Sequence, residues 1–241
     1  MGLGGDTSAA GAGLEQANAH RRSRLLELLV FLFLIVPSMV FSFLDATGTG
    51  LGFVLTAMAT ILRDLSLVSL IAFFLWRNGE PVRRIGWTQG KGLREVVVGL
   101  LAFVAVLYGA ALLQILLRRV GLESPERLPH DLIASGAGEL VLASLLVIVV
   151  AFAEETIFRG YLILRLFEVT HSRLAALLLS AAIFAVGHGY EGTAGVATVG
   201  AMGVAFGLVY LWRGSLIAPI VMHFLQDFTV LVLLPVLGVG P

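Results

Sequence analysis

Residues 140–160 read LVLASLLVIVVAFAEETIFRG, and this stretch decides the class of the protein. No charge occurs from Leu140 to Ala153, as is typical of a helix in lipid, although a full crossing takes roughly 20 residues. Glu154 and Glu155 follow at once, and a charge inside a bilayer costs about 2.5–3.5 kcal/mol on insertion scales. The stretch therefore predicts a membrane helix whose polar end has a function.

The remainder of the chain is equally apolar. Of its 241 residues, 58% are hydrophobic and 13% are charged, whereas soluble domains are about 25% charged. Lys+Arg and Asp+Glu number 16 each, so no basic surface for nucleic acid is indicated. The lack of cysteine excludes disulfides, thiolate metal ligands and cysteine nucleophiles. The composition indicates a polytopic α-helical membrane protein.

Seven apolar stretches approach the length of a membrane span. They are Leu25–Leu44, Leu51–Trp76, Val96–Leu117, the run from Leu140 that meets Glu154, Leu174–Gly187, Thr193–Trp212 and Ser215–Leu237. In the second stretch, Arg63 and Asp64 are adjacent and project in different directions, so they either pair with other spans or mark a break in the helix. The predicted fold is an all-α transmembrane helix bundle.

The chain divides into three parts within one membrane domain. Residues 1–20 are predicted to be a disordered cytosolic tail, with a cleaved signal peptide as the alternative. Residues 21–138 hold the N-terminal spans, and residues 139–241 hold the spans with polar motifs. Most basic residues fall in alternate loops, which predicts a multi-pass protein of the cell membrane with a cytoplasmic N-terminus.

The first polar cluster follows the apolar run. Glu155 and Arg159 are four residues apart on one helix face and can pair, whereas Glu154 points about 100° away. One carboxylate is thus left without a local partner, and such a group, when desolvated, suits proton transfer. The alternative is an interfacial helix end at which these side chains meet lipid headgroups.

Two further clusters hold histidines. His188 ends the fifth stretch, where it is either functional or a histidine satisfied by its neighbours. His223 and Asp227 are four residues apart, so Asp227 either fixes the tautomer of His223, lines a polar cavity with it, or forms a packing hydrogen bond between helices. On straight helices, His188 meets Glu154 only if the fifth span starts before residue 174 or the fourth extends past Arg165 and tilts.

Other motifs are absent or structural. The sequence contains no H-E-x-x-H and no G-x-S-x-G, so neither the common zinc-protease geometry nor a serine nucleophile is supported. Gly203 and Gly207 form a G-x-x-x-G in the sixth span, which we interpret as a site of close helix packing.

In combination, the polar clusters resemble the CAAX protease and bacteriocin-processing family of intramembrane proteases. The resemblance is carried by Glu154-Glu155-x-x-x-Arg159, Phe184-x-x-x-His188 and His223-x-x-x-Asp227, and by Gly207, Tyr210, Arg213-Gly214-Ser215-Leu216 and Ala218-Pro219 between the last two. It covers about residues 139–230. It implies a bundle of seven to eight spans with a catalytic cavity inside.

The resemblance also implies roles. Glu154 would be the general base for a water that His188 positions, and Arg159 would hold Glu155. His223 and residue 227 would stabilise the oxyanion. The family frequently has Asn at position 227; because an ionised Asp cannot donate a hydrogen bond, Asp227 is expected to be protonated or to orient His223.

The cofactor and the substrate stay open at this level. The family has been described as metalloproteases, and Glu154, His188 and His223 would make a three-ligand Zn²⁺ site if the reaction depends on metal, whereas the glutamate mechanism needs none. The expected partners are the lipid bilayer and a membrane-associated substrate, such as a CAAX tail, a leader peptide or a bacteriocin precursor.

Two other functions fit the same residues. A non-catalytic scaffold or bacteriocin self-immunity protein of this fold would keep its phenotype without Glu154 and His188. A proton-coupled transporter would use the Glu and His side chains as a relay, although the sequence lacks the paired broken helices of two related halves.

Overall fold

The computed structural model describes residues 22–37, 39–40, 52–88, 92–123, 125 and 129–238. Within these ranges the regular structure is entirely helical, as the sequence predicted, and residues 22–37 form the first helix. The later elements are α2 (Phe53–Arg77), η1 (Val82–Ile85), α3 (Gly92–Arg119), η2 (His130–Leu132), α4 (Ala137–Glu154), η3 (Glu155–Leu162), α5 (Ile163–Thr170), α6 (Arg173–Val186), η4 (Gly189–Glu191), α7 (Gly192–Arg213), α8 (Ile217–Phe228), η5 (Thr229–Leu233) and α9 (Leu234–Val236).

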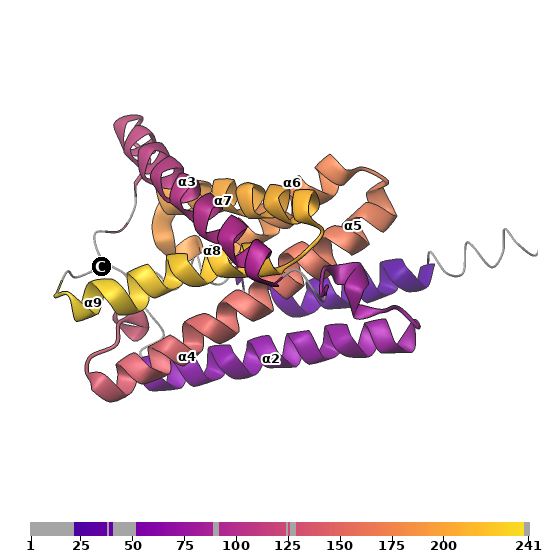
Figure 1. The fold of residues 1–241 in the computed structure, drawn as a ribbon, viewed down its shortest axis with the longest axis horizontal. Coiled ribbons are helices and arrows are strands. Elements are labelled where there is room, and N and C mark those ends of the chain that lie inside the picture. Colours follow the sequence, from indigo (N-terminus) through magenta and orange to yellow (C-terminus); the bar gives the residue numbers. More distant parts are fainter. Residues whose placement is uncertain are drawn as a thin grey trace, which may run out of the picture.

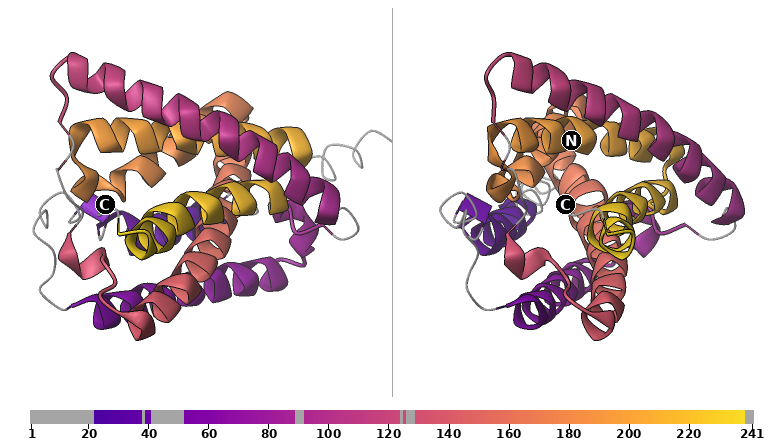
Figure 2. Two further views of the ribbon diagram at one scale, coloured as in Figure 1. Left: turned by 60° about the vertical axis from the view of Figure 1, so that its left-hand side comes forward. Right: turned by 90° about the vertical axis from the view of Figure 1, so that its left-hand side faces the viewer.

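The helices form one bundle in which segments distant in sequence lie side by side (Figure 1). α2 packs along α4, α6 packs along α7, and α3 crosses α7 and α8 (Figure 2). α8 in turn contacts α4, so the helix that ends at Glu154 and the helix that carries His223 are neighbours. The topology therefore brings the predicted polar motifs into one region.

Five of the described helices are long and apolar enough to cross a membrane: Phe53–Arg77, Gly92–Arg119, Ala137–Thr170, Gly189–Arg213 and Ile217–Val236. The protein is thus a multi-pass membrane protein. α6 is apolar but has only 14 residues, about 21 Å, which is less than a full crossing. The first predicted span lies partly outside the described residues, and a count of seven or eight spans is not reached within the described ranges.

The fourth predicted span is longer than its apolar run. α4, η3 and α5 form one helical segment, Ala137–Thr170, that passes through both glutamates and beyond Arg165. A prediction based on the length of the apolar run ends the span at its first charged residue. Here the charged side chains are buried against other helices, so the helix continues past them. An extension of this span past Arg165 was one of the two conditions under which Glu154 and His188 were expected to lie at the same depth in the membrane.

The segment η3 is a π-helix that begins at Glu155, the second glutamate of the motif. Backbone bonds in a π-helix reach one residue further than in an α-helix, and all residues of η3 are buried. Insertions of this type are uncommon and often occur at functional sites. Glu155 and Arg159 lie on this segment and face the bundle interior.

Arg63 and Asp64 do not break α2. The helix is continuous from Phe53 to Arg77, and Arg63 Nε donates a 2.9 Å hydrogen bond to Asp64 Oδ1. Of the two alternatives that the sequence left open, the break in the helix is excluded, and the flexible guanidinium of Arg63 folds back onto Asp64 on the same helix. Asp64 is buried in the face of α2 that packs against the bundle.

The G-x-x-x-G of α7 is a packing site, as expected. A methyl group at Gly203 would lie 3.3 Å from both Ala181 Cβ and the Phe184 ring, and one at Gly207 would overlap Leu177. The absence of side chains at these positions lets α6 and α7 approach closely.

Gly160, the glycine that ends the polar motif, is predicted to tolerate no larger residue without a loss of stability. A Cβ at this position would lie 2.8 Å from the backbone carbonyl oxygen of Ile85, which cannot move aside as a flexible side chain could. We expect Gly160→Ala to lower the free energy of unfolding by about 1–3 kcal/mol, the usual cost of overpacking. Thermal unfolding in detergent measures this loss. The control Gly109→Ala should be neutral, because open space surrounds Gly109; equal stability of the two variants would contradict the prediction.

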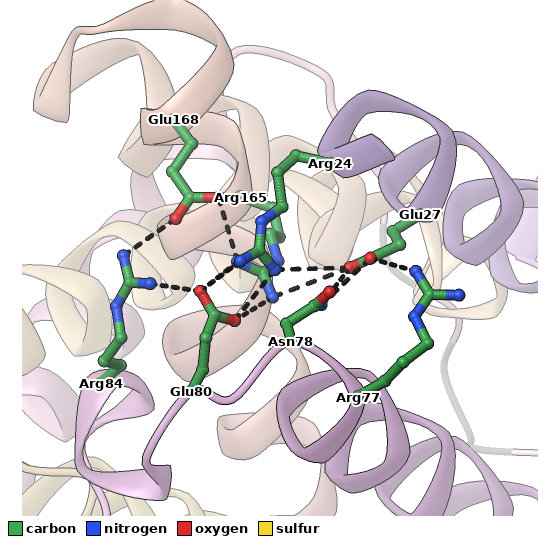
Figure 3. Close-up of polar contacts among 8 residues, drawn as sticks. All are labelled: Arg24, Glu27, Arg77, Asn78, Glu80, Arg84, Arg165 and Glu168. Atoms are coloured by element: carbon green, nitrogen blue, oxygen red, sulfur yellow. Dashed lines mark hydrogen bonds and ion pairs between the residues drawn. The ribbon is translucent and has the colours of Figure 1, made fainter. Parts of the chain in front are cut away.

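A network of ion pairs joins the N-terminal helices to α5 (Figure 3). Its centre is the buried Arg165, whose guanidinium contacts Glu80 at 2.5 Å and Glu168 at 3.0 Å. Arg24 from the first helix also pairs with Glu80, at 2.9 Å. The remaining members are Glu27, Arg77, Asn78 and Arg84.

This network makes stability depend on the ionisation of Glu80. Burial pushes the pKa of Glu80 upward, but the hydrogen bond from Arg165 and the charges of Arg165, Arg24 and Arg84 outweigh burial, so the pKa lies below its ordinary value of 4.5. A carboxyl with a depressed folded-state pKa stabilises the fold above its unfolded value and loses that contribution as the pH falls. We expect the melting temperature to fall below pH 4.5 in the wild type and to fall less in Glu80→Gln; equal pH dependence would contradict this.

Candidate active site

Three predicted site residues meet in direct contact. Glu155 Oε1 accepts a 2.8 Å hydrogen bond from Arg159 Nη1 and lies 2.8 Å from His223 Nδ1. Glu155 is therefore shared between its own segment η3 and α8, 68 positions away in sequence. All three side chains are buried. The Glu155–Arg159 pairing agrees with the spacing, but the bond to His223 cannot be read from spacing along one helix.

Glu154 faces the other ring nitrogen of the same histidine. Glu154 Oε2 lies 3.8 Å from His223 Nε2, and Asp227 Oδ2 lies 3.4 Å from it. Because the Glu155 carboxylate can only accept, Nδ1–H of His223 donates to it, and Nε2 of the same ring is turned toward Glu154 and Asp227. Glu154 Oε2 is buried and has no protein hydrogen-bond partner. A carboxylate oxygen is thus free beside an oriented imidazole.

His188 reaches this group through an aromatic ring. It follows the C-terminus of α6, and its Nδ1 lies 3.0 Å from the carbonyl oxygen of Phe184. The Phe184 ring stands 4.7 Å from the His188 ring and 6.0 Å from the His223 ring. Since a carbonyl only accepts, Nδ1 of His188 donates and Nε2 keeps its lone pair. His188 therefore lies beside the site, against the same Phe184 ring that His223 approaches.

Phe184 has a larger part in the site than its place in the motif indicated. Its ring lies under the Arg159 guanidinium at 4.4 Å and meets Phe158 edge-on at 5.0 Å. Phe206 of α7 approaches the same guanidinium at 5.3 Å. These rings make cation–π contacts with the buried Arg159 guanidinium and help to hold it beside Glu155.

The predicted zinc ligands do not converge. Among the described residues, no group of three or more His, Asp or Glu side chains is arranged to hold a metal ion. The set Glu154, His188 and His223 does not form a three-ligand site in the described structure.

Sequence reasoning gave no site role to two groups that border this cluster. The charges of Asp64 and Arg63 on α2 act on Glu154. The Tyr190 ring stands 5.9 Å from the ring of His188. The only hint in the sequence was that Arg63 and Asp64 are charged residues within a predicted span. The sequence does not show which face of α2 packs against α4, because that depends on contacts between helices.

A comparison with protein families places these residues in a known context. Residues 136–229 match the family model described as type II CAAX prenyl endopeptidase Rce1-like. This segment is similar to Rce1-like endopeptidases. The resemblance to the CAAX protease and bacteriocin-processing family is thereby confirmed. Searches of curated proteins and of solved structures each found no match.

The Rce1-like segment contains every residue that the motifs singled out. It runs from the start of α4 into the first residue of η5, and so includes the Glu155–Arg159–His223 contacts as well as Glu154, His188 and Asp227. α2 and α3 lie outside it. The match covers less than half of the 241 residues, so the contribution of the N-terminal helices must be argued from the structure alone.

Proposed function

We propose that this protein is an intramembrane endopeptidase that hydrolyses a peptide bond of a membrane-associated protein or peptide. The observation that carries the proposal is the approach of Glu154 Oε2 to His223 Nε2 at 3.8 Å, between the long helix of the Rce1-like segment and α8. The description of the matched family, a CAAX prenyl endopeptidase, supports the reaction class.

Glu154 is suited to activate water. A separation of 3.8 Å lets one water lie within about 2.8 Å of both Glu154 Oε2 and His223 Nε2. In our mechanism Glu154 removes a proton from that water as the oxygen attacks the scissile carbonyl carbon. The proton then passes to the departing amine as the C–N bond breaks, so protons and electrons balance. His188, with its free Nε2, assists in positioning the water.

His223 is suited to the opposite role. Its Nδ1–H bond to Glu155, which Arg159 holds in turn, fixes the ring orientation. A proton on Nε2 then stabilises the oxyanion of the tetrahedral intermediate. Asp227, at 3.4 Å from Nε2, takes the orienting role on this side. The contact supports the orienting role among the two that the sequence left open, since it requires no donor on Asp227.

The substrate class follows the matched family. We propose a CAAX-type C-terminal tail, with leader or bacteriocin precursors as the other processing class. We also propose that the N-terminus lies in the cytoplasm, because most basic residues of the sequence fall in alternate loops.

A peptide library tests the proposal. Purified protein in detergent is incubated with prenylated CAAX peptides, unprenylated peptides and leader peptides, with and without a chelator, and mass spectrometry identifies new termini. Cleavage of at least one class at one bond is expected. No cleavage of any class, together with proton-coupled flux in liposomes, would establish the transporter instead.

A further inference from the structure

The guanidinium of Arg63 is an exposed cation at the candidate site that the proposed mechanism does not use. It lies near the middle of α2, where a charge directed at lipid is costly. Its side chain is 52% exposed, whereas that of Asp64, its partner at 2.8 Å, is 1% exposed. The pair therefore consists of a buried carboxylate and an accessible guanidinium.

Arg63 lies on an inward edge of α2. At 100° per residue, Thr56, Thr60, Arg63 and Leu67 lie within one narrow stripe beside the buried face that includes Ile61 and Asp64. Thr56, Thr60 and Leu67 are half-buried, and the Thr56 hydroxyl is buried without a protein partner. This edge therefore borders the buried face of α2, and the side of α2 opposite the buried face is exposed, as at Leu62 and Ser66.

The level of Arg63 along α2 is that of Glu154. Near the start of α2, Phe53 belongs to the same hydrophobic cluster as Ala143 of α4, and near its end Phe74 stacks on Tyr161 of η3 with the ring centroids 6.3 Å apart. Residue 63 lies midway between these contacts, and so opposite the last turn of α4. The charge of Arg63 accordingly acts on Glu154 and on Tyr190.

The free donors of Arg63 match a carboxylate. Nε and Nη2 both bond to Asp64 Oδ1, which fixes the plane of the guanidinium and leaves further N–H donors unused. Arg159, the other guanidinium among the described residues of the site, is buried and bound to Glu155. With Glu154, Glu155 and Asp227 nearby, an anionic substrate end would be repelled unless a cation received it.

We propose that Arg63, held by Asp64, binds the C-terminal carboxylate of the substrate. This inference rests on the proposed endopeptidase function. An endopeptidase that cuts inside a four-residue CAAX tail acts at most three residues from the chain end, an extended distance of roughly 10 Å. The site would thus select peptides with a free C-terminus close to the scissile bond, and Arg63 would act as a specificity-determining residue.

A substrate-by-variant comparison tests this. One prenylated CAAX peptide is prepared as the free acid and as the C-terminal amide, and kcat/KM is measured for both with the wild type and with Arg63→Gln. We expect the wild type to prefer the acid by roughly ten- to hundredfold, the effect of one charge-assisted carboxylate contact. Arg63→Gln should cleave the two peptides equally, mainly through loss of activity on the acid. Arg63→Lys, which keeps the charge but not the fork, should retain part of the preference.

Arg119→Gln is the matched control, because this exposed arginine ends α3, and it should keep the full preference. If Arg63→Gln fails to fold, two other variants test the proposal: Arg63→Lys, and Asp64→Asn, which releases the guanidinium from its partner. Each should show a lower ratio of kcat/KM for the acid to kcat/KM for the amide than the wild type. Equal cleavage of both peptides by the wild type, or an unchanged preference in Arg63→Gln, would overturn the carboxylate site while leaving the endopeptidase intact. Cleavage of neither peptide nor any other library member would overturn both proposals.

Discussion

Replacing Glu154 with glutamine is expected to lower kcat/KM by roughly 10²–10⁴-fold, the usual contribution of a positioned general base. The amide keeps the size of the carboxylate but cannot accept the proton of the attacking water. Stability should stay close to that of the wild type, because Glu154 Oε2 makes no hydrogen bond that the variant would lose. Cleavage rates and thermal unfolding of the same preparation measure both quantities.

The same helix provides a matched control. Glu139, in the first turn of α4, is bound to Ser135 at 2.6 Å and lies at the far end of that helix from Glu154. Glu139→Gln should therefore keep its full cleavage rate. A Glu154→Gln variant that cleaves within threefold of the wild type would rule out Glu154 as the base.

The largest effect on stability is expected at Arg165. Arg165→Met leaves Glu80 and Glu168 without their main partner in a buried network, and breaking such a pair typically costs about 3–5 kcal/mol. The double variant Arg165→Met/Glu80→Met should recover only part of this loss, because it removes the carboxylate that lost Arg165 but also removes a partner of the buried Arg24. Thermal unfolding in detergent compares the three proteins.

The control for Arg165 is an arginine without such burial. Arg119→Met at the exposed end of α3 should change stability by no more than about 0.5 kcal/mol. If Arg165→Met is as stable as Arg119→Met, the network of Figure 3 makes no net contribution to the fold.

The sequence was informative wherever local chemistry conflicted with lipid. Charges beside long apolar runs identified Glu154, Glu155 and Asp227 as residues that need a protein partner, and the structure brings all three to His223. The all-helical fold followed from composition for the same reason, since lipid requires each span to satisfy its own backbone hydrogen bonds.

What could not be predicted depends on contacts between helices. Helical spacing pairs Glu155 with Arg159 but is silent about His223, which reaches Glu155 only because α8 packs against α4 and η3. Likewise, the end of the fourth span was placed too early, because burial of Glu155, Arg159 and Arg165 by neighbouring helices permits charge where an isolated span would not. The π-helical turn of η3 has no signal in hydropathy.

The most direct test of the central claim is cleavage of a CAAX peptide in H₂¹⁸O, read by mass spectrometry. The account predicts that the wild type forms one new carboxyl terminus that contains ¹⁸O from solvent, and that Glu154→Gln forms essentially none in the same time. Formation of the labelled product at equal rates by both proteins, or no new terminus with the wild type, would contradict it.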